Sequence, residues 1–299
     1  MVNLVVGATG LVGSEICRLL LERGRHVRAL VRETSSPDKV ARLANLGAST
    51  VTGDLKDRAS LDAACDGAQL VVSTASSTLS RQAGDSIETV DHQGQLDLID
   101  AAEAAGVEHF ILISFPKFEL DFPLQSAKRS AEQRLRSSRM SYTILQPTFF
   151  SEVWLGPALG FDAAGGTARI YGAGENKVSW ISLYDVARFA ASAASDATAP
   201  QSRNAVIELG GPEALSPLEV VRLAEQATGK TFIVEHVPEE ALRAQYESAD
   251  DPLQKSFAAL MLYCARCEPI DMDATLRDFR LEPLKTVAEH LAAATAPNV

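Results

Sequence analysis

The chain has 299 residues, of which 46% are hydrophobic and 22% are charged, and its formal net charge is −11. This composition supplies a sizeable apolar core and fits one or two domains. An acidic chain lacks the basic surface that nucleic-acid binding needs, and no apolar run reaches the roughly 20 residues of a membrane span. We therefore expect a cytoplasmic, soluble monomer or homodimer that binds neither nucleic acid nor membrane.

The first half of the chain alternates short β-rich runs with amphipathic helical patterns. The predicted strands are residues 2–6, 26–31, 49–52, 69–73, 109–114 and 141–146. The predicted helices between them are residues 11–24, 36–46, 58–66, 87–105 and 124–138. Because strands that alternate with helices form a parallel sheet covered on both faces, we predict an α/β fold with a Rossmann-type doubly wound sheet.

The regularity weakens after residue 147, where the glycine-rich stretch 161–182 is predicted to be a loop. The elements predicted after it are helix 183–196, strand 204–209, helix 216–228, strand 231–236 and helices from 238 to 293. We predict a Rossmann domain over residues 1–150. A smaller α/β substrate lobe over 151–299 should lie at the carboxyl ends of the parallel strands, with 183–209 packed back on the sheet.

Residues 7–13 read GATGLVG, a Gly-x-x-Gly-x-x-Gly spacing between a predicted strand and a predicted helix. Gly7 permits a tight turn, Gly10 lets the backbone approach a pyrophosphate, and Gly13 lets helix and sheet pack closely. The N–H groups and dipole of the helix N-terminus favour the anion. The predicted dinucleotide contacts are Gly7, Ala8, Thr9, Gly10, Leu11, Val12 and Gly13. The alternative is a strand–turn–helix junction without a ligand.

The choice between NAD(H) and NADP(H) depends on the residue that ends the second strand, about 20 residues beyond the glycines. That place holds Arg32, and a guanidinium suits a phosphate. We therefore predict NADP(H) over NAD(H). Alternatively, Glu33 reaches the ribose hydroxyls and Arg32 only stacks on adenine.

Other strand ends should also line the cofactor, because ligands bind at the carboxyl edge of such sheets. Asp54 could accept from the adenine amino group, and Leu55 could cover the ring. Ser73, Thr74 and Ala75 should lie beside the pyrophosphate and ribose. Each of these residues alone is more often part of a turn.

Several stretches occur in one order along the chain: GATGLVG, LVRE, TGDLKD, AAEAAGVEHFILIS, Lys128, SYTILQPTFFSE and ELGGPEALSPLEVVRLAEQATGK. Together they resemble the NmrA-like and isoflavone-reductase-like branch of the atypical short-chain dehydrogenase/reductases over nearly the whole chain. The resemblance implies a Rossmann domain, a small C-terminal lobe and bound NADP(H). Some members of that branch reduce quinones or aromatic substrates, and others bind the nucleotide as redox sensors, regulators or assembly factors.

Lys128 matches the lysine that reductases of the branch keep at the start of the helix after the fifth strand. The Tyr-x-x-x-Lys of the wider superfamily does not match, because Leu124 replaces the tyrosine, while Ser114 stands near the usual serine beside the cofactor. Lys128 could hydrogen-bond the nicotinamide ribose or stabilise an oxyanion. The alternative is a solvent-exposed lysine on an amphipathic helix. Tyr142 or Tyr184 could replace the acid only if the fold brings it close.

Aromatic residues follow the fifth and sixth predicted strands and could wall an apolar pocket for a flat ring. The predicted substrate contacts are Phe115, Phe118, Phe150 and Trp154. The stretch that should pass the nicotinamide comprises Pro147, Thr148 and Phe149. The alternative is that two or three of the aromatic residues belong to the core, as we expect for Trp180.

We predict an NAD(P)H-dependent reductase of quinone-like or aromatic enone-like small molecules, which spread incoming charge over their own π-system and need little protein acid. The missing tyrosine motivates a second hypothesis, a non-catalytic NADP(H)-binding redox sensor, regulator or assembly protein. A nucleotide-sugar epimerase or dehydratase is discounted, because such enzymes normally retain Tyr-x-x-x-Lys.

Neither the cysteines nor the acids of the sequence indicate a metal site. Cys264 and Cys267 form a single C-x-x-C, which supplies too few ligands for tetrahedral zinc. We interpret them as ordinary helix cysteines, with reversible oxidation as the alternative. Asp91 and Asp97 are too scattered to argue for paired-carboxylate chemistry.

Overall fold

The structure, a computed structural model, describes residues 1–79, 81–195, 199–281 and 283–295. The chain divides into two compact units. The first comprises Met1–Phe115, Pro123–Gln146 and Val186–Ile207, and the second comprises Pro116–Phe122, Pro147–Asp185 and Glu208–Val299. Each unit therefore takes segments from both sides of residue 150, and the division into two folding domains at that residue stays a prediction.

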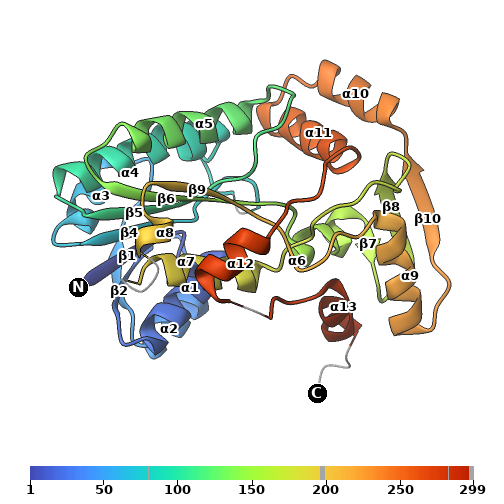
Figure 1. Ribbon diagram of the computed structural model, residues 1–299. Coiled ribbons are helices and arrows are strands. Elements are labelled where there is room, and N and C mark those ends of the chain that lie inside the picture. The colour runs from blue at the N-terminus through green and yellow to red at the C-terminus, as the bar shows by residue number, and fades with distance from the viewer. Residues whose placement is uncertain (80, 196–198, 282, 296–299) are drawn as a thin grey trace. The chain divides into compact units, whose positions relative to one another are not determined.

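A seven-stranded sheet, whose strands lie mainly in the first unit, has the order β3-β2-β1-β4-β5-β6-β9 (Figure 1). Its strands are β1 (Val2–Val6), β2 (His26–Val31), β3 (Ser49–Thr52), β4 (Leu70–Ser73), β5 (His109–Ile113), β6 (Ser141–Pro147) and β9 (Ala205–Leu209). All neighbouring strands from β3 to β6 pair in parallel. The predicted Rossmann-type α/β class is confirmed. The strand order reverses at β1, which is the switch point where such sheets bind ligands.

The inner strands form because their residues are apolar on both faces. Every residue of β4 and β5 is buried, and so are the last four residues of β1. A parallel sheet covered on two sides selects such continuous apolar runs rather than an alternating pattern. On one face, Val71 and Phe110 of the strands pack in one core cluster with Leu98 and Leu135 of the helices.

Two layers of helices cover the sheet (Figure 1). One layer contains α3 (Arg58–Cys65), α4 (Gln93–Ala104) and α5 (Pro123–Arg136). The other contains α1 (Leu11–Glu22), α2 (Pro37–Asn45) and α7 (Leu183–Ala193), and a short α8 (Ala199–Ser202) precedes β9. Local sequence sets their ends: Asp57 caps α3 by accepting from the Ala59 N–H at 3.1 Å, and Pro37 begins α2.

A six-residue π-helical turn, η1 (Ile87–His92), precedes α4 where the apolar spacing predicts one continuous helix. Ser86 and Thr89 cap it reciprocally, because each side chain accepts from the other's backbone N–H at 3.0 Å. A π-helical turn holds one more residue than an α-turn and is frequently found at functional sites. It also packs against α5.

The second unit contains a separate three-stranded sheet in the order β10-β8-β7. β7 (Phe161–Asp162) and β8 (Thr167–Tyr171) form an antiparallel hairpin, and β10 (Ile233–Val237) pairs with β8 in parallel. The prediction of a loop over 161–182 is wrong in this part. The glycines that suggested a loop form the hairpin's turn: Gly166 has a φ of +71°, and Asp162 Oδ1 accepts from the Gly165 N–H at 2.8 Å.

Helices complete the second unit. They are α6 (Ser151–Trp154), η2 (Pro157–Leu159), α9 (Pro217–Thr228), α10 (Glu239–Ser248), α11 (Pro252–Cys264), α12 (Asp273–Phe279) and α13 (Val287–Thr295). Apolar residues of α6, α9, α10, α11 and α13 form one core cluster with Ile170 and Trp180. Within the described ranges, no helix combines the length and apolarity that crossing a membrane requires.

Candidate functional site

The turn between β1 and α1 is built from glycines that larger residues could not replace without movement of the backbone. Gly7 has a φ of +82°, and the Gly10 N–H donates to its carbonyl at 2.9 Å. A Cβ at Gly13 would lie 2.2 Å from the Gly7 carbonyl oxygen. Gly10 is the N-cap of α1 and has no side chain that could bond the first N–H groups of the helix. The turn therefore has the tight backbone that the glycine spacing predicts, and its contact with a pyrophosphate stays a prediction.

Two predicted residues at the end of β4 lie directly against this turn. A Cβ at Gly7 would lie 2.5 Å from Thr74 Oγ1 and 2.9 Å from the Ala75 nitrogen. Ser73 faces elsewhere, because its hydroxyl donates to the buried Gln95 Oε1 at 2.8 Å. Thr74 and Ala75 thus form one wall of the turn, whereas Ser73 braces α4.

The two predicted residues after β3 have partners inside the protein. Leu55 is 6% exposed and belongs to the core cluster of the first unit. Asp54 Oδ1 accepts from the Lys56 N–H at 2.9 Å, and its Oδ2 lies 3.2 Å from Lys56 Nζ. Their contacts with adenine stay predictions.

Arg32 directly follows β2, and its side chain is already paired. Its Nη1 lies 2.7 Å from Oδ2 of Asp85, whose side chain is 1% exposed. Lys56 forms an ion pair with the other oxygen of the same carboxylate. Glu33 is exposed. An acid that the sequence analysis did not consider thus holds the guanidinium expected to read a phosphate.

Lys128 and Asp91 form a buried ion pair. Lys128 lies on α5, one turn after the buried Leu124, and is only 5% exposed, so it is not a solvent-exposed lysine. Its Nζ lies 3.7 Å from Oδ1 of Asp91, which is beyond hydrogen-bond range. Asp91 comes from η1, is fully buried, and its Oδ2 accepts from the Ser77 N–H at 2.9 Å and the Ser77 hydroxyl at 2.7 Å.

This pair leaves hydrogen-bonding capacity unused. Among the residues that the structure describes, the buried Asp91 Oδ1 has no hydrogen-bond donor, because Lys128 Nζ stays 3.7 Å away from it. Buried polar atoms are nearly always bonded, so such atoms mark a place for a ligand or a bridging water.

Ser114 and Phe115, which follow β5, are held by Arg129 of α5. The Arg129 guanidinium donates to the Ser114 hydroxyl at 3.1 Å and lies 5.6 Å from the centre of the Phe115 ring. It also pairs with the buried Glu132 at 3.0 Å. Arg129 thus fixes both predicted residues in the first unit.

Neither spare tyrosine gains support as a proton donor. Tyr142 pairs with Phe110 near the start of β6, at the edge of the sheet opposite to the carboxyl ends of the strands. Tyr184 lies in the second unit, is 46% exposed, and has the Lys285 ammonium 5.0 Å from its ring centre.

The aromatic residues predicted around the substrate lie mostly in the second unit, where they pack on one another. Phe149 and Trp154 contact edge to face with ring centres 4.6 Å apart. Phe118 stacks on Tyr263 at 3.6 Å. Phe118, Phe149 and Trp180 are buried, so Trp180 is a core residue as expected.

The strand end before these aromatic residues is held by backbone and hydroxyl bonds within the second unit. Pro147 ends β6, and the Thr148 N–H donates to the Leu209 carbonyl at 2.9 Å. Phe150 is half-buried and forms a backbone bridge to Ile181. Their contacts with a nicotinamide or substrate stay predictions.

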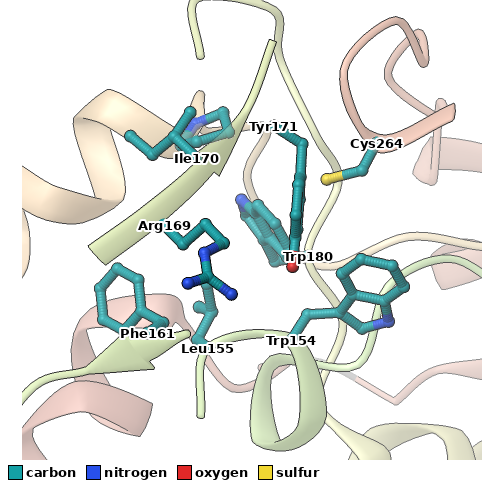
Figure 2. Close-up of a pocket in the computed structure, with 9 residues that line it drawn as sticks. Trp154, Leu155, Phe161, Arg169, Ile170, Tyr171, Trp180 and Cys264 are labelled. Carbon is teal, nitrogen blue, oxygen red and sulfur yellow. The ribbon is translucent and has the colours of Figure 1, made fainter. Parts of the chain in front are cut away.

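A pocket of about 20 Å³ in the second unit is lined by Trp154, Arg169, Tyr171, Trp180 and Cys264, among other residues (Figure 2). The Tyr171 hydroxyl donates to the Leu159 carbonyl at 3.0 Å. This volume holds about one water molecule and is far too small for an aromatic substrate.

The cysteines are packing residues. All four are buried and unpaired by disulfides. Burial raises the pKa of Cys17, Cys65 and Cys267 to about 12 and raises that of Cys264 well above its usual range. A reactive cysteine needs a lowered pKa and solvent access, so these thiols do not suit redox chemistry.

Sequence reasoning dismissed Asp91 and missed Ser77, Lys56, Asp85 and Arg129. A signal for Asp91 is present, because residues 87, 91, 94, 95 and 98 repeat at the spacing of one buried helix face. An acid on such a face needs a buried partner. Lys56 and Asp85 form an ion pair although they are 29 positions apart in the chain, so the sequence shows no periodic pattern that would predict it.

Comparison with known proteins assigns the chain to a family. The model of the NmrA-like family matches residues 2–291, nearly the whole chain. The chain belongs to the NmrA-like family. The predicted resemblance is confirmed, and the glycine turn and Lys128 of this NmrA-like chain lie within the matched range.

The relatives of this NmrA-like protein include a reductase and an assembly factor. The NAD(P)H azoreductase of Xenophilus azovorans is 34% identical over 230 residues, 76% of this chain and 74% of the relative. The photosystem II assembly factor Ycf39 of Cyanophora paradoxa is 31% identical over 241 residues, 79% and 71% of the two chains. The NADPH-dependent quinone oxidoreductase QOR2 of Escherichia coli, solved with NADPH, superposes with a TM-score of 0.78 over 98% of this chain and 99% of its own, at 24% identity. This last likeness shows the fold alone.

Proposed function

We propose that this chain is an NADPH-dependent reductase of quinone-like or other flat conjugated acceptors. The observation that carries the proposal is Lys128, a buried ammonium that pairs with Asp91 at 3.7 Å without a hydrogen bond, while Ser77 holds Asp91 in place. A structural lysine would have its donors satisfied within the protein. The similarity to an NAD(P)H azoreductase supports the same reaction class.

The residues of the β1–α1 turn fit a dinucleotide. A Cβ at Gly7 or Gly13 would clash with atoms of the protein itself, so only glycine allows a turn this tight, and the N-cap Gly10 has no side chain that bonds the donors after it. These features suit a pyrophosphate close to the backbone. Bound NADPH would supply the hydride, and the protein would contribute position and charge.

Lys128 can serve such a reaction without a tyrosine. An ammonium can stabilise the oxygen that gains negative charge when a quinone-like ring accepts a hydride, or bond the nicotinamide ribose. Leu124, in the place of the tyrosine, is buried and apolar and offers no proton. The acceptor must therefore spread the charge over its own π-system, which azo compounds and quinones do.

The proposal is tested by NADPH oxidation with a panel of quinones, azo dyes and aromatic enones. We expect turnover with at least one class. NADPH binding without turnover across the panel would contradict a reductase and favour the second candidate.

The second candidate is an NADP(H)-binding assembly factor or regulator. It is favoured by Leu124 and by the similarity to Ycf39, named as an assembly factor. Both candidates require nucleotide binding, so turnover separates them. If the second is correct, Lys128→Met alters nucleotide or partner affinity and the wild type shows no reaction.

Arg32→Ala is expected to weaken NADPH binding by more than about tenfold and NADH binding by less than about threefold, because the lost guanidinium would contact only the 2′-phosphate. Fluorescence titration of the wild type and the variant with each nucleotide measures the two losses in affinity. The control is Arg58→Ala, which removes an exposed arginine of α3 that pairs with Asp62. Equal losses for the two nucleotides would favour the alternative in which Glu33 binds the ribose and Arg32 only stacks on adenine.

A further inference from the structure

Four charged side chains lie close together in the segments that follow β2 and β3 and in the segment that precedes η1. They are Arg32, Asp54, Lys56 and Asp85, which we call the Asp85 cluster. Arg32 Nη1 lies 2.7 Å from Asp85 Oδ2, Lys56 donates to Asp85 Oδ1, and Lys56 Nζ lies 3.2 Å from Asp54 Oδ2. The side chain of Asp85 is 1% exposed, whereas those of Arg32 and Lys56 are 25% and 27% exposed. Both cations thus face solvent beside one buried acid.

Asp85 is held in place by hydrogen bonds of its own loop, whereas the charges of Arg32 and Lys56 lie at the ends of long side chains. Asp85 Oδ2 accepts from the Gln82 N–H at 2.9 Å, and the Gln82 side chain bonds the Thr34 hydroxyl. The Thr89 hydroxyl donates to the Gly84 carbonyl at 2.8 Å. These bonds hold Asp85 near the end of β2, while rotation of their own stems lets the cations reach another anion.

The Asp85 cluster contains two positive and two negative side chains. Burial alone would raise the pKa of Asp85, but hydrogen bonds from Lys56, the Gln82 N–H and Arg32 outweigh it and lower that pKa. Asp85 is therefore ionised at neutral pH and forms ion pairs with both cations. An incoming phosphate has to compete with it.

We propose that Lys56 and Arg32 together read the 2′-phosphate of NADP(H), and that Asp85 competes with this phosphate for both cations. The inference rests on the proposed nucleotide-binding function. The adenosine ribose of a nucleotide bound to such a sheet lies at the end of β2, where Arg32 stands. Because β3 neighbours β2, Lys56 approaches from the adjacent strand end, and an ammonium binds phosphate as a point charge. Asp85 then sets how strongly the protein prefers NADP(H).

The decisive variant is Asp85→Asn, which removes one charge and keeps an acceptor for the Gln82 N–H. We expect NADPH to bind about tenfold more tightly and NADH to bind unchanged, the size expected for one charge removed a few ångströms from an anion at a partly exposed site. Asp62→Asn is the matched control, because it removes the same charge from an exposed pair with Arg58 on α3. The measurement is fluorescence titration of each nucleotide at one salt concentration, with a melting curve for every variant.

Lys56→Gln tests the second half of the proposal and should weaken NADPH binding about tenfold while leaving NADH binding unchanged. Weaker NADPH binding in Asp85→Asn would overturn the competition and make Asp85 a residue that positions the cations. Equal changes in NADPH and NADH affinity, or equally tighter NADPH binding in Asp62→Asn, would contradict the proposal that this cluster recognises the 2′-phosphate. A wild-type protein that binds neither nucleotide would instead contradict the proposed function itself.

Discussion

Replacing Lys128 with methionine is expected to lower the turnover of the best acceptor by a factor on the order of 10² or more, while NADPH binding changes by less than about tenfold. The ammonium would stabilise negative charge on the acceptor mainly in the transition state, and losing one such donor typically has an effect of this size. Steady-state kinetics and nucleotide titration on the same preparation separate the two quantities.

The fold of this variant needs its own check, because methionine leaves the Asp91 carboxylate buried without its ion pair. The double variant Lys128→Met with Asp91→Asn removes both charges and should melt closer to the wild type. Lys230→Met, at an exposed lysine of the second unit, is the control for a lysine-to-methionine change. Turnover that stays at the wild-type level in the double variant would exclude Lys128 from the chemistry.

Gly13→Ala is the second change with a large expected effect. The new Cβ would lie 2.2 Å from the Gly7 carbonyl oxygen and 2.8 Å from its carbon, so the backbone of the turn has to move. Overpacking of this kind costs about 1–3 kcal/mol of folding free energy. The displaced N–H groups would also weaken binding of both nucleotides by more than about tenfold, because each misplaced hydrogen bond costs about 1 kcal/mol.

The matched control is Gly156→Ala in the second unit. There a Cβ would make only ordinary contacts, 3.4 Å and 3.5 Å from backbone oxygens, and the φ of −125° suits any residue. Thermal melting and nucleotide titration of both variants isolate the effect of crowding in the turn. A Gly13→Ala protein that keeps wild-type affinity would show that the pyrophosphate does not bind at this turn.

The fold could be predicted from the sequence because its signals are local. The runs VNLVV and HVRALV match β1 and β2 residue for residue, since parallel strands covered on both faces are rich in apolar, β-branched residues. The glycine turn was predictable because steric demands at Gly7 and Gly13 allow one residue type. The hairpin of the second unit was missed because Gly165 and Gly166 fit a loop and a hairpin turn equally well.

The candidate site was less predictable, because its contacts join distant parts of the chain. Lys128 was expected to be a functional residue or an exposed one, and only the fold shows Asp91 and Ser77 beside it. The position of Arg32 followed from strand counting, but its pairing with Asp85 spans 53 residues. Aromatic residues near strand ends could not be divided between pocket and core, since both environments select the same side chains.

The Asp91–Lys128 pair depends on the number of residues in the π-helical turn η1 and not only on their identity. Each residue advances an α-helix by about 100°. Removing one residue between Ile87 and His92 would rotate the preceding segment by that angle against α4, so buried Ile87 and buried Leu98 could not both keep their places while Asp91 still faced Lys128. A family member one residue shorter here would need a different partner for its lysine, and aligning the family on this turn would separate chains with the Asp91–Lys128 pair from chains without it.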